Sequence, residues 1–227
     1  MGTLWGGRFK KEIDQSMQSF ISSISFDKRL VNFDILGSIA HAKMLGKCEI
    51  ISKQESEKIA QGLQLILADL EKGCLVIDDQ AEDIHTWVES TLRERIGDTA
   101  GKLHTARSRN DQIVLDERMY LKEEIQRIQT RLKGLQSAFL DAAKEYLGFI
   151  MPGYTHLQHA QPILLSHHLL AYFFKFNRDR ERLIDLYRRV DILPLGSAAL
   201  AGTSYPIDRE YVARELHFSQ ISKNSLD

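Results

Sequence analysis

The sequence predicts an all-α protein in which a small helical amino-terminal domain is followed by the first long helices of a central helical bundle. Three observations support this fold class. Helix-capping signals repeat in the first half of the chain, a heptad pattern of apolar residues continues unbroken through its middle, and the alternation typical of strands is scarce. Four prolines in 227 residues also leave long helices possible. We place a domain boundary near residue 105, with a first domain over 1–105 and the bundle part over 106–227.

The first domain is predicted to begin with a helical hairpin. Asp27 is placed to cap a helix that continues to about Gly46. Ser52 and Glu55 then form a capping-box pattern, in which the serine and the glutamate each satisfy a free backbone N–H at the start of a second helix. That second helix is expected to end near Gly73.

Three further helices are predicted, two of them long. Residues 82–95 fit a short helix that Gly97 ends, and residues 108–147 fit a helix of about 60 Å at the usual helical rise. Residues 163–189 fit another long helix, which is apolar on nearly every face between residues 169 and 176. The heptad positions of the first long helix are Leu121, Ile125, Ile128, Leu132, Leu135, Phe139, Ala142 and Tyr146. Because two such helices cannot cover each other's apolar surface, we expect further helices from later sequence, from identical subunits or from both.

Composition and charge narrow the class of partner. Thirty Lys and Arg residues against 31 Asp and Glu give a formal net charge of -1, so no net field attracts nucleic acid or an anionic membrane. Cys48 and Cys74 have no Cys-x-x-Cys spacing, which argues against a disulfide framework and a zinc cluster. The amino terminus has no long apolar stretch. We therefore expect a soluble, cytoplasmic protein that binds neither nucleic acid nor membranes.

The segment HTARSRNDQ, residues 104–112, is the first candidate for chemistry. It places the donors of Ser108, Arg109 and Asn110 at the start of the long helix. Helix amino termini favour anions through free N–H groups and the helix dipole, and arginine adds a forked donor that suits carboxylates. The alternative is an ordinary capped and solvated helix start.

The segment GYTHLQHAQP, residues 153–162, is the second candidate. His156 and His159 are three residues apart, whereas the familiar zinc pair is four apart with a glutamate between, so we predict no metal. Pro162 disfavours helical geometry at Gln161, which places these side chains on a loop or turn before the second long helix. Acid/base chemistry and ordinary hydrogen bonding both remain open for the two histidines.

A third candidate is EDIHTWVE, residues 82–89. Glu82, Asp83 and His85 fit a metal or acid/base site, but a capped helix start with a solvated acidic turn explains Glu82 and Asp83 equally well and is favoured. We expect His85 to face the same cleft as His104. The glycine-containing segment GSAALAG at 196–202 lacks the dinucleotide-binding pattern and is predicted to be a flexible turn between helices.

Several segments together resemble the argininosuccinate lyase family of the aspartase/fumarase superfamily. They are LWGGRF at 4–9, EDIH at 82–85, AGKLHTARSRNDQ at 100–112, GYTHLQHAQP at 153–162, LPLGSAALAG at 193–202 and NSLD at 224–227. The resemblance is collinear over the whole chain and implies a fumarase/aspartase-like bundle. One departure is Ala106, where the usual family form has glycine.

The resemblance implies reversible cleavage of argininosuccinate into arginine and fumarate by β-elimination, without a metal or an organic cofactor. A base removes a proton from the carbon beside a carboxylate, and an acid protonates the departing guanidinium nitrogen. Donors aimed at the carboxylate stabilise the additional negative charge that develops on it. The family also implies a homotetramer whose active sites are each built by three subunits.

The family's functional residues correspond to particular positions of this chain. The acid/base histidine corresponds to His156. The substrate-binding positions are Ser23, His85, Ser108, Arg109, Asn110, Thr155 and Gln161. The resemblance assigns His159 to a supporting role.

The family's serine base lies on a mobile loop with the pattern GSSxMPxKxN, and this pattern does not occur in the 227 residues. We therefore expect the chain to be a truncated, amino-terminal half that lacks the base when alone. Two alternatives are another fumarate-forming lyase, of the adenylosuccinate lyase, fumarase or aspartase type, and a non-catalytic structural protein like the δ-crystallins of the same family.

Overall fold

The computed structural model describes residues 14, 17 and 20–227. It contains two compact units, one formed by Met1–Glu117 with Leu193–Asp227 and the other by Arg118–Ile192. The LWGGRF segment at 4–9 lies outside the described residues. The predicted domain boundary near residue 105 stays a prediction.

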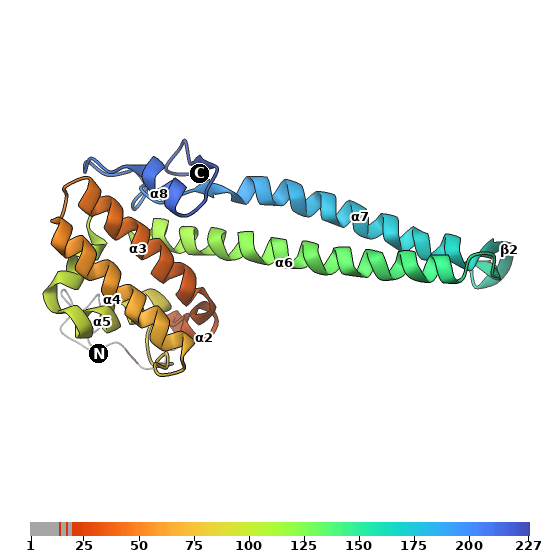
Figure 1. The fold of residues 1–227 in the computed structure, drawn as a ribbon, viewed down its shortest axis with the longest axis horizontal. Helices are drawn as coiled ribbons and strands as arrows, with labels where there is room; N and C mark the ends of the chain where they lie inside the picture. The colour runs from red at the N-terminus through yellow and green to blue at the C-terminus, as the bar shows by residue number, and fades with distance from the viewer. Residues whose placement is uncertain (1–13, 15–16, 18–19) are drawn as a thin grey trace. The chain divides into compact units, whose positions relative to one another are not determined.

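The predicted helical class is confirmed, since helices dominate both units (Figure 1). The first unit contains α2 (Ile24–Asp27), the 3-10 segment η2 (Lys28–Leu30), α3 (Val31–Lys47), α4 (Lys53–Glu71), α5 (Ile84–Ile96), the 3-10 segment η3 (Gly97–His104) and α8 (Arg209–Glu215). The long helix α6 (Arg109–Glu145) starts in the first unit and continues into the second. The second unit adds β1 (Ile150–Thr155), β2 (Gln158–Leu164) and α7 (Leu165–Val190), and the short strands β3 (Ile192–Leu193) and β4 (Gln220–Ile221) pair with each other.

Two of the three predicted caps in the first unit are present. Ser52 and Glu55 form the complete capping box at the start of α4. At the start of α5, the side chain of Asp83 accepts a hydrogen bond from the N–H of Thr86. The prediction for Asp27 was wrong, because its side chain makes no capping bond and α3 begins only at Val31. The Asp27 carboxylate instead accepts bonds from Ser23 and from the N–H of Ile84, so a long-range contact replaces the local cap.

The core of the first unit forms where α3, α4 and α5 pack together. Its largest fully buried apolar side chains include Ile35, Met44, Leu45, Ile59, Leu63, Ile66, Ile84 and Leu92. Gly46 on α3 permits a close helix contact, since a Cβ there would lie 2.5 Å from the Cβ of Ser56 on α4. The Ser56 hydroxyl also donates to the carbonyl oxygen of Ala42 at 2.8 Å, which fixes the two helices at this crossing.

The second unit is an antiparallel pair formed by α7 and the part of α6 after Glu117. The rings of Phe139 and Tyr172 stack with centroids 5.5 Å apart, and Gln136 donates to the carbonyl oxygen of Phe173. Near the other end of the pair, Lys122 forms an ion pair with Asp191. The same helix pair is visible along its length in Figure 1.

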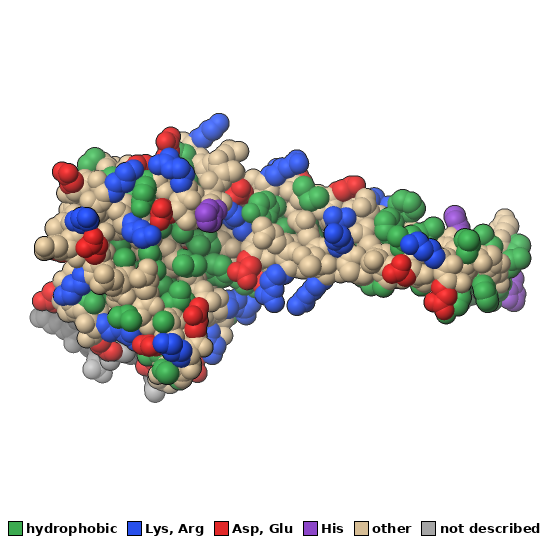
Figure 2. All heavy atoms as spheres, viewed as in Figure 1, with side chains coloured by type: hydrophobic (Ala, Val, Ile, Leu, Met, Phe, Trp, Pro, Cys, Tyr) green, Lys and Arg blue, Asp and Glu red, His purple; other side chains and the backbone are tan. Residues whose placement is uncertain are grey.

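The apolar surface of the second unit is only partly covered. Ile125 is 3% exposed, whereas its heptad neighbours Leu121 and Ile128 are 41% and 43% exposed. Other large apolar side chains exposed on this unit are Leu135, Phe174, Ile184 and Leu186, and Figure 2 shows hydrophobic side chains on the visible face of both helices. This exposure agrees with the expectation that the two helices pack against further helices.

The segment before α7 differs from its prediction. Residues 150–155 and 158–164 form an antiparallel hairpin, where a loop or turn was expected. His156 and Leu157 at its tip have φ angles of 52° and 61°, which is the pattern of a tight two-residue hairpin turn. Pro152 and Pro162 face each other across the strands. Because proline lacks a backbone N–H and is depleted in strands, this pair hid the hairpin in the sequence.

Within the part of the chain that the structure describes, no helix combines the length and the apolar content needed to cross a membrane.

Replacing Gly46 with alanine is expected to destabilise the first unit. The new methyl group would meet Ser56 Cβ at 2.5 Å, and relief requires α3 and α4 to separate. We expect a loss of about 2 kcal/mol in the free energy of unfolding, measured by urea denaturation. Gly101→Ala is the matched control, because nothing lies within 4 Å of a Cβ at that position. Equal stability of the two variants would contradict the close packing.

Candidate active site

The predicted site residues fall into two groups, one in each unit. The first unit contains Ser23, His85, Ser108, Arg109 and Asn110. The second unit contains Thr155, His156 and Gln161, all of them on the hairpin.

The start of α6 organises the donors of the first group. The Ser108 hydroxyl accepts a bond from the N–H of Asn110, and the Asn110 side chain donates to the carbonyl oxygen of Ala199. Arg109 donates through Nη1 to Gln112 Oε1 at 2.8 Å. Its guanidinium also lies 3.6 Å from the carboxylate of Glu89. The helix start, the hydroxyl, the amide and the guanidinium together favour a carboxylate ligand.

Ala106 lies in the tight turn that leads into α6. Its φ angle is 59°, in the left-handed region that L-residues with a Cβ occupy at a cost. The resemblance placed glycine at this position in the usual family form, and glycine adopts this conformation without the penalty.

Asp111 is an organising residue that sequence reasoning did not single out. One carboxylate oxygen accepts a bond from the N–H of Ser108 at 3.0 Å. The other accepts bonds from the N–H groups of Gly196 and Ala198 at 2.9 and 2.8 Å. The turn at 196–202, predicted to be flexible, is therefore fixed to the start of α6. In the sequence, the signal for this contact was that residues 100–112 and residues 193–202 both belong to the segments that resemble the family.

Ser23 lies beside the start of α5. Its N–H donates to the carbonyl oxygen of Glu82, and its hydroxyl donates to Asp27 Oδ2. The same Asp27 oxygen accepts the N–H of Ile84 at 3.4 Å. Asp27, which sequence reasoning treated only as a helix cap, thus joins Ser23 to the helix that contains His85.

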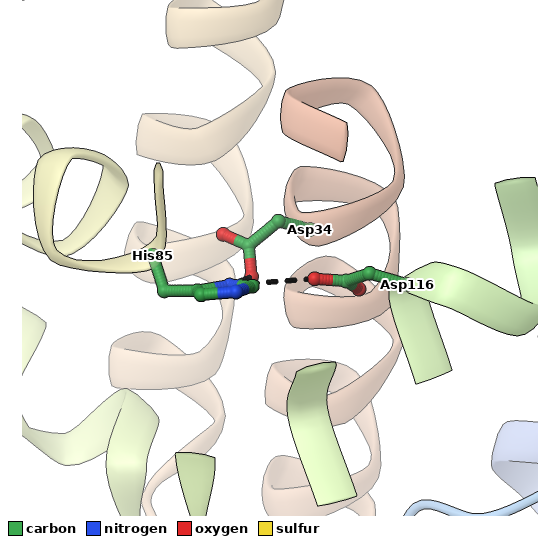
Figure 3. Close-up of side chains that lie close together, drawn as sticks. All are labelled: Asp34, His85 and Asp116. Atoms are coloured by element: carbon green, nitrogen blue, oxygen red, sulfur yellow. Dashed lines mark hydrogen bonds and ion pairs between the residues drawn. The ribbon is translucent and has the colours of Figure 1, made fainter. Parts of the chain in front are cut away.

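His85 belongs to a buried cluster with Asp34 and Asp116 (Figure 3). Its Nδ1 atom lies 2.8 Å from Asp34 Oδ1 and 3.4 Å from Asp116 Oδ2, and the three residues are at most 2% exposed. His104 instead contacts Glu89 at the surface. The expected cleft shared by His85 and His104 was therefore wrong, because the His85 ring points into the interior.

The two carboxyl groups of the cluster have opposite pKa shifts. Burial would raise the pKa of Asp34, but the hydrogen bond and charge of His85, together with Arg107 and Gln112, lower it to about 2. Burial and the neighbouring charge of Asp34 raise the pKa of Asp116 well above its ordinary value.

Arg107 supplies positive charge behind the site. Its guanidinium donates to Ser38 Oγ at 2.9 Å, and burial lowers its pKa while Asp34 and Glu89 oppose that shift. Burial would raise the pKa of Glu89, but the hydrogen bond from His104 and the charges of Arg109 and Arg107 keep it below the ordinary value.

His41 is the remaining buried histidine near this turn. Its Nε2 lies 2.9 Å from the carbonyl oxygen of Thr105, so the neutral ring donates this bond. Burial and the charge of Arg107 lower the pKa of His41 to about 3. The ring therefore stays neutral and fixes the turn before α6.

Asp34, His85 and Asp116 are also a group that can offer metal ligands, since one ligand atom from each lies within 4.8 Å of the others. The short contact between His85 and Asp34 is a direct hydrogen bond, and Arg107 already balances carboxylate charge there. The geometry thus fits a hydrogen-bonded cluster better than an ion site. The prediction of no metal stays a prediction.

Two of the hollows in the first unit differ in their relation to the predicted site residues. One of about 180 Å³ is lined by Thr86, Glu89, Ser90, Arg93, Ala100, Gly101 and His104, next to the carboxylate that Arg109 faces. A larger one of about 860 Å³ surrounds the end of α3 and the start of α4. The lysines around it are paired with Glu55, Glu57, Asp208 and Glu215. None of the predicted site residues lines either hollow, but Glu89 of the smaller one lies 3.6 Å from the guanidinium of Arg109, so we favour the smaller hollow as part of the candidate site.

The hairpin of the second unit gives its two histidines different surroundings. His159 Nε2 lies 2.9 Å from the hydroxyl of Tyr154, and the centroids of the two rings are 4.8 Å apart. His156 is exposed at the tip, and Thr155 and Gln161 are exposed on the strands. An exposed imidazole in a fixed turn is available for proton transfer.

Comparison with protein families gives a match to a lyase family model over residues 7–227. The chain is 58% identical to the argininosuccinate lyase of Pelotomaculum thermopropionicum over 100% of its length, and to that of Moorella thermoacetica over 99%. It covers 49% and 48% of those two proteins, so the chain spans about half the length of the curated relatives it matches.

Two solved structures have folds similar to this one. A variant of EDDS lyase with bound fumarate is 32% identical, with a TM-score of 0.77 over 88% of this chain and 39% of that one. A structure described as fumarate lyase:delta crystallin, from Brucella melitensis and bound to cobalt, is 20% identical with a TM-score of 0.73, over 90% of this chain and 50% of that one. The second similarity concerns the fold alone.

Ala106→Gly is expected to stabilise the chain, because glycine removes the cost of the positive φ angle at the turn. The gain should be about 1 kcal/mol at most, since glycine also increases the entropy of the unfolded chain. Ala106→Val should instead lower stability, because a β-branched residue fits this conformation poorly. Urea denaturation of the three proteins measures both effects. A stabilised valine variant would contradict the left-handed turn.

The low pKa of His41 predicts acid sensitivity. The unfolded histidine takes up a proton near its ordinary pKa of 6.5, whereas the folded one does so only near about 3. The contribution of His41 to stability is therefore complete above about pH 6.5 and is lost as the pH falls toward about 3. His41→Asn, whose amide can donate to Thr105, should show a flatter decline in unfolding free energy over this range. An unchanged slope would contradict a buried neutral histidine.

Proposed function

The chain belongs to the lyase family, and from that premise we propose that it is the amino-terminal half of an argininosuccinate lyase. The reaction is the reversible β-elimination of argininosuccinate to arginine and fumarate, a step of arginine biosynthesis. The observation behind this proposal is 58% identity to argininosuccinate lyases along essentially the whole chain. The proposed cellular setting is the cytoplasm, with no nucleic-acid or membrane partner.

The start of α6 is proposed to bind the substrate carboxylate next to the carbon that loses its proton. As that proton leaves, negative charge accumulates on the carboxylate, and fixed donors stabilise it more in the transition state than in the ground state. Ser108, Arg109 and Asn110 supply these donors, and Ser23 adds a hydroxyl near the start of α5. Organic cofactors and metals have no role in this scheme.

His156 is proposed as the acid/base group, with Thr155 and Gln161 as substrate contacts beside it. Its exposed position at the hairpin tip supports a role in proton transfer to a substrate held by other elements. The serine base is assigned to sequence beyond this half of the protein. His159, bonded to Tyr154, supports the hairpin without touching the substrate.

A homotetramer with shared active sites is proposed for the whole protein. Two observations support it: exposed apolar heptad residues such as Leu121 and Ile128 need partners, and the predicted site residues divide between two compact units. Identical subunits satisfy both requirements by packing their long helices together.

A second candidate function is elimination of fumarate from a different amino substrate. The similarity to EDDS lyase, whose variant was solved with bound fumarate, favours this alternative over a fumarase or an adenylosuccinate lyase. A non-catalytic role like that of the δ-crystallins is the remaining possibility.

A substrate panel tests the reaction in a complete form. This form continues residues 1–227 to the full length of the relatives, natively or by fusion to the carboxyl-terminal half of the Pelotomaculum thermopropionicum enzyme. We expect fumarate, measured by its ultraviolet absorbance, from argininosuccinate and not from EDDS, adenylosuccinate, malate or aspartate. Turnover of another substrate alone would replace the proposal by that lyase, and no turnover would favour the structural role. The isolated 227-residue chain should show no robust turnover, because it lacks the base.

His156→Asn in the complete form should lower kcat by about 100-fold or more, since an amide cannot transfer the proton. Size-exclusion chromatography with light scattering should still report the wild-type oligomer. His159→Asn is the matched variant on the same hairpin and should lose much less. Unchanged turnover in His156→Asn would remove this residue from the mechanism.

A further inference from the structure

The cluster of Asp34, His85 and Asp116 presents two carboxyl groups to a single imidazole nitrogen. His85 Nδ1 lies 2.8 Å from Asp34 and 3.4 Å from Asp116, and one N–H donates fully to only one of them. Both aspartates are at most 1% exposed. Two adjacent carboxylates with so little solvent repel each other, so one of them is favoured as the neutral acid.

The hydrogen-bond partners identify which aspartate is ionised. Asp34 Oδ1 accepts bonds from His85 Nδ1 and from Gln112 Nε2. Asp34 Oδ2 has no hydrogen-bond partner among the described residues, and neither oxygen of Asp116 has one, so Asp34 receives two donors and Asp116 none. A buried carboxylate is stabilised by donors, and a buried carboxyl group without them is stable only when protonated.

The charged and polar groups that surround the cluster agree with this assignment. They are His85 on α5, Arg107 on the turn before α6, and Arg109 and Gln112 on α6. The charge of Arg107 acts to lower the pKa of both Asp34 and Asp116. Burial and the charge of Asp34 outweigh Arg107 at Asp116 and raise its pKa.

The amide of Gln112 links Asp34 to Arg109. A guanidinium has only donors, so Gln112 turns its oxygen toward Arg109, which donates to it at 2.8 Å. The NH₂ group of Gln112 then faces Asp34 Oδ1, which must accept. An ionised Asp34 offers this group a charged acceptor, which is stronger than the oxygen of a neutral carboxyl group.

We propose that the Asp34–His85–Asp116 cluster keeps its shared proton on Asp116, so that the Asp34 carboxylate acts through Gln112 to hold Arg109 in position for the substrate carboxylate. This makes Asp34 and Gln112 positioning residues, with Asp116 as the neutral neighbour that keeps Asp34 ionised, and it gives His85 a role in the interior in place of direct substrate contact. The proposal rests on the proposed function for the role of Arg109. Its account of the proton stands independently of that function.

The location of the proton is tested by thermal unfolding of the complete form between about pH 4 and pH 9. Asp116 has a raised pKa when folded, so wild-type stability falls as the pH rises above the unfolded value. Asp116→Asn cannot ionise, and its unfolding temperature should increase relative to wild type as the pH rises. Asp34→Asn should be less stable than wild type over the same range, because Asp34 has a lowered pKa. Asp69→Asn, on an exposed ion pair with Arg95, is the control and should follow wild type.

The role of the Gln112 amide is tested by turnover of argininosuccinate in the complete form. Asp34→Asn and Gln112→Met should each lower kcat/KM by about tenfold or more, whereas Asp116→Asn should stay within about threefold near neutral pH. The alkaline limb of the kcat/KM profile should lie at higher pH in Asp116→Asn than in wild type. If Asp116 only supported the fold, the alkaline limb of the kcat/KM profile would lie at the same pH in Asp116→Asn and in wild type.

A double variant tests the direction of the hydrogen bonds. In Asp34→Asn with Gln112→Glu, the new Asn amide can donate to the new carboxylate, which still accepts from Arg109. This variant should recover about tenfold of the activity that Asp34→Asn loses. Absence of recovery in a folded tetramer would overturn the proposed direction.

Failure of the proton assignment and failure of the proposed function give different results. If Asp116→Asn loses as much stability and activity as Asp34→Asn, the proton is not held on Asp116 and the proposal is wrong. If wild type releases no fumarate from argininosuccinate, the proposed function fails, while the unfolding measurements still decide where the proton lies. If Asp34→Asn does not fold, the pH dependence of Asp116→Asn decides alone.

Discussion

The buried carboxylate of Asp34 is the interaction on which the first unit depends most. It lies on α3 and accepts bonds from His85 on α5 and from Gln112 on α6. A charge in a protein interior is costly unless donors and opposite charge surround it. Here the carboxylate on α3 receives its donors from two other helices, so the packing of α3, α5 and α6 and the stabilisation of the charge depend on each other. Helix geometry and site geometry are thereby linked.

The start of α6 is fixed from both sides by residues with no expected contact to substrate. Asp111 binds the turn at 196–202 through the N–H groups of Gly196 and Ala198, and His41 and Arg107 hold the preceding turn. Rigid support matters at this place, because donors stabilise a developing charge only when they are already oriented before the reaction. The positive φ angle of Ala106 belongs to the same arrangement. Its strain is maintained by the contacts around it.

The second unit has a different character. Its helices pair through aromatic side chains such as Phe139 and Tyr172, yet heptad residues on α6 stay exposed. Hydrophobic burial drives most helix association, so such a surface is expected to gain stability from additional helices. The chain spans about half the length of the curated relatives it matches. The exposed hairpin with His156 lies in the same unit.

The sequence by itself determined the helical class, the capping box of Ser52, the ends of the long helices to within a few residues, and the family. These features depend on neighbours along the chain or on ordered motifs, and both are visible in a sequence. Only the tertiary structure decided that Asp27 accepts the N–H of Ile84 at the start of α5 and caps no helix of its own, that His85 turns inward, and that residues 150–164 form a hairpin. In each case the deciding partner is distant in sequence or is a backbone group, and capping and periodicity rules do not include such partners. The cluster of Asp34, His85 and Asp116 is the clearest example, since its three residues lie on three separate helices and meet only after the core has formed.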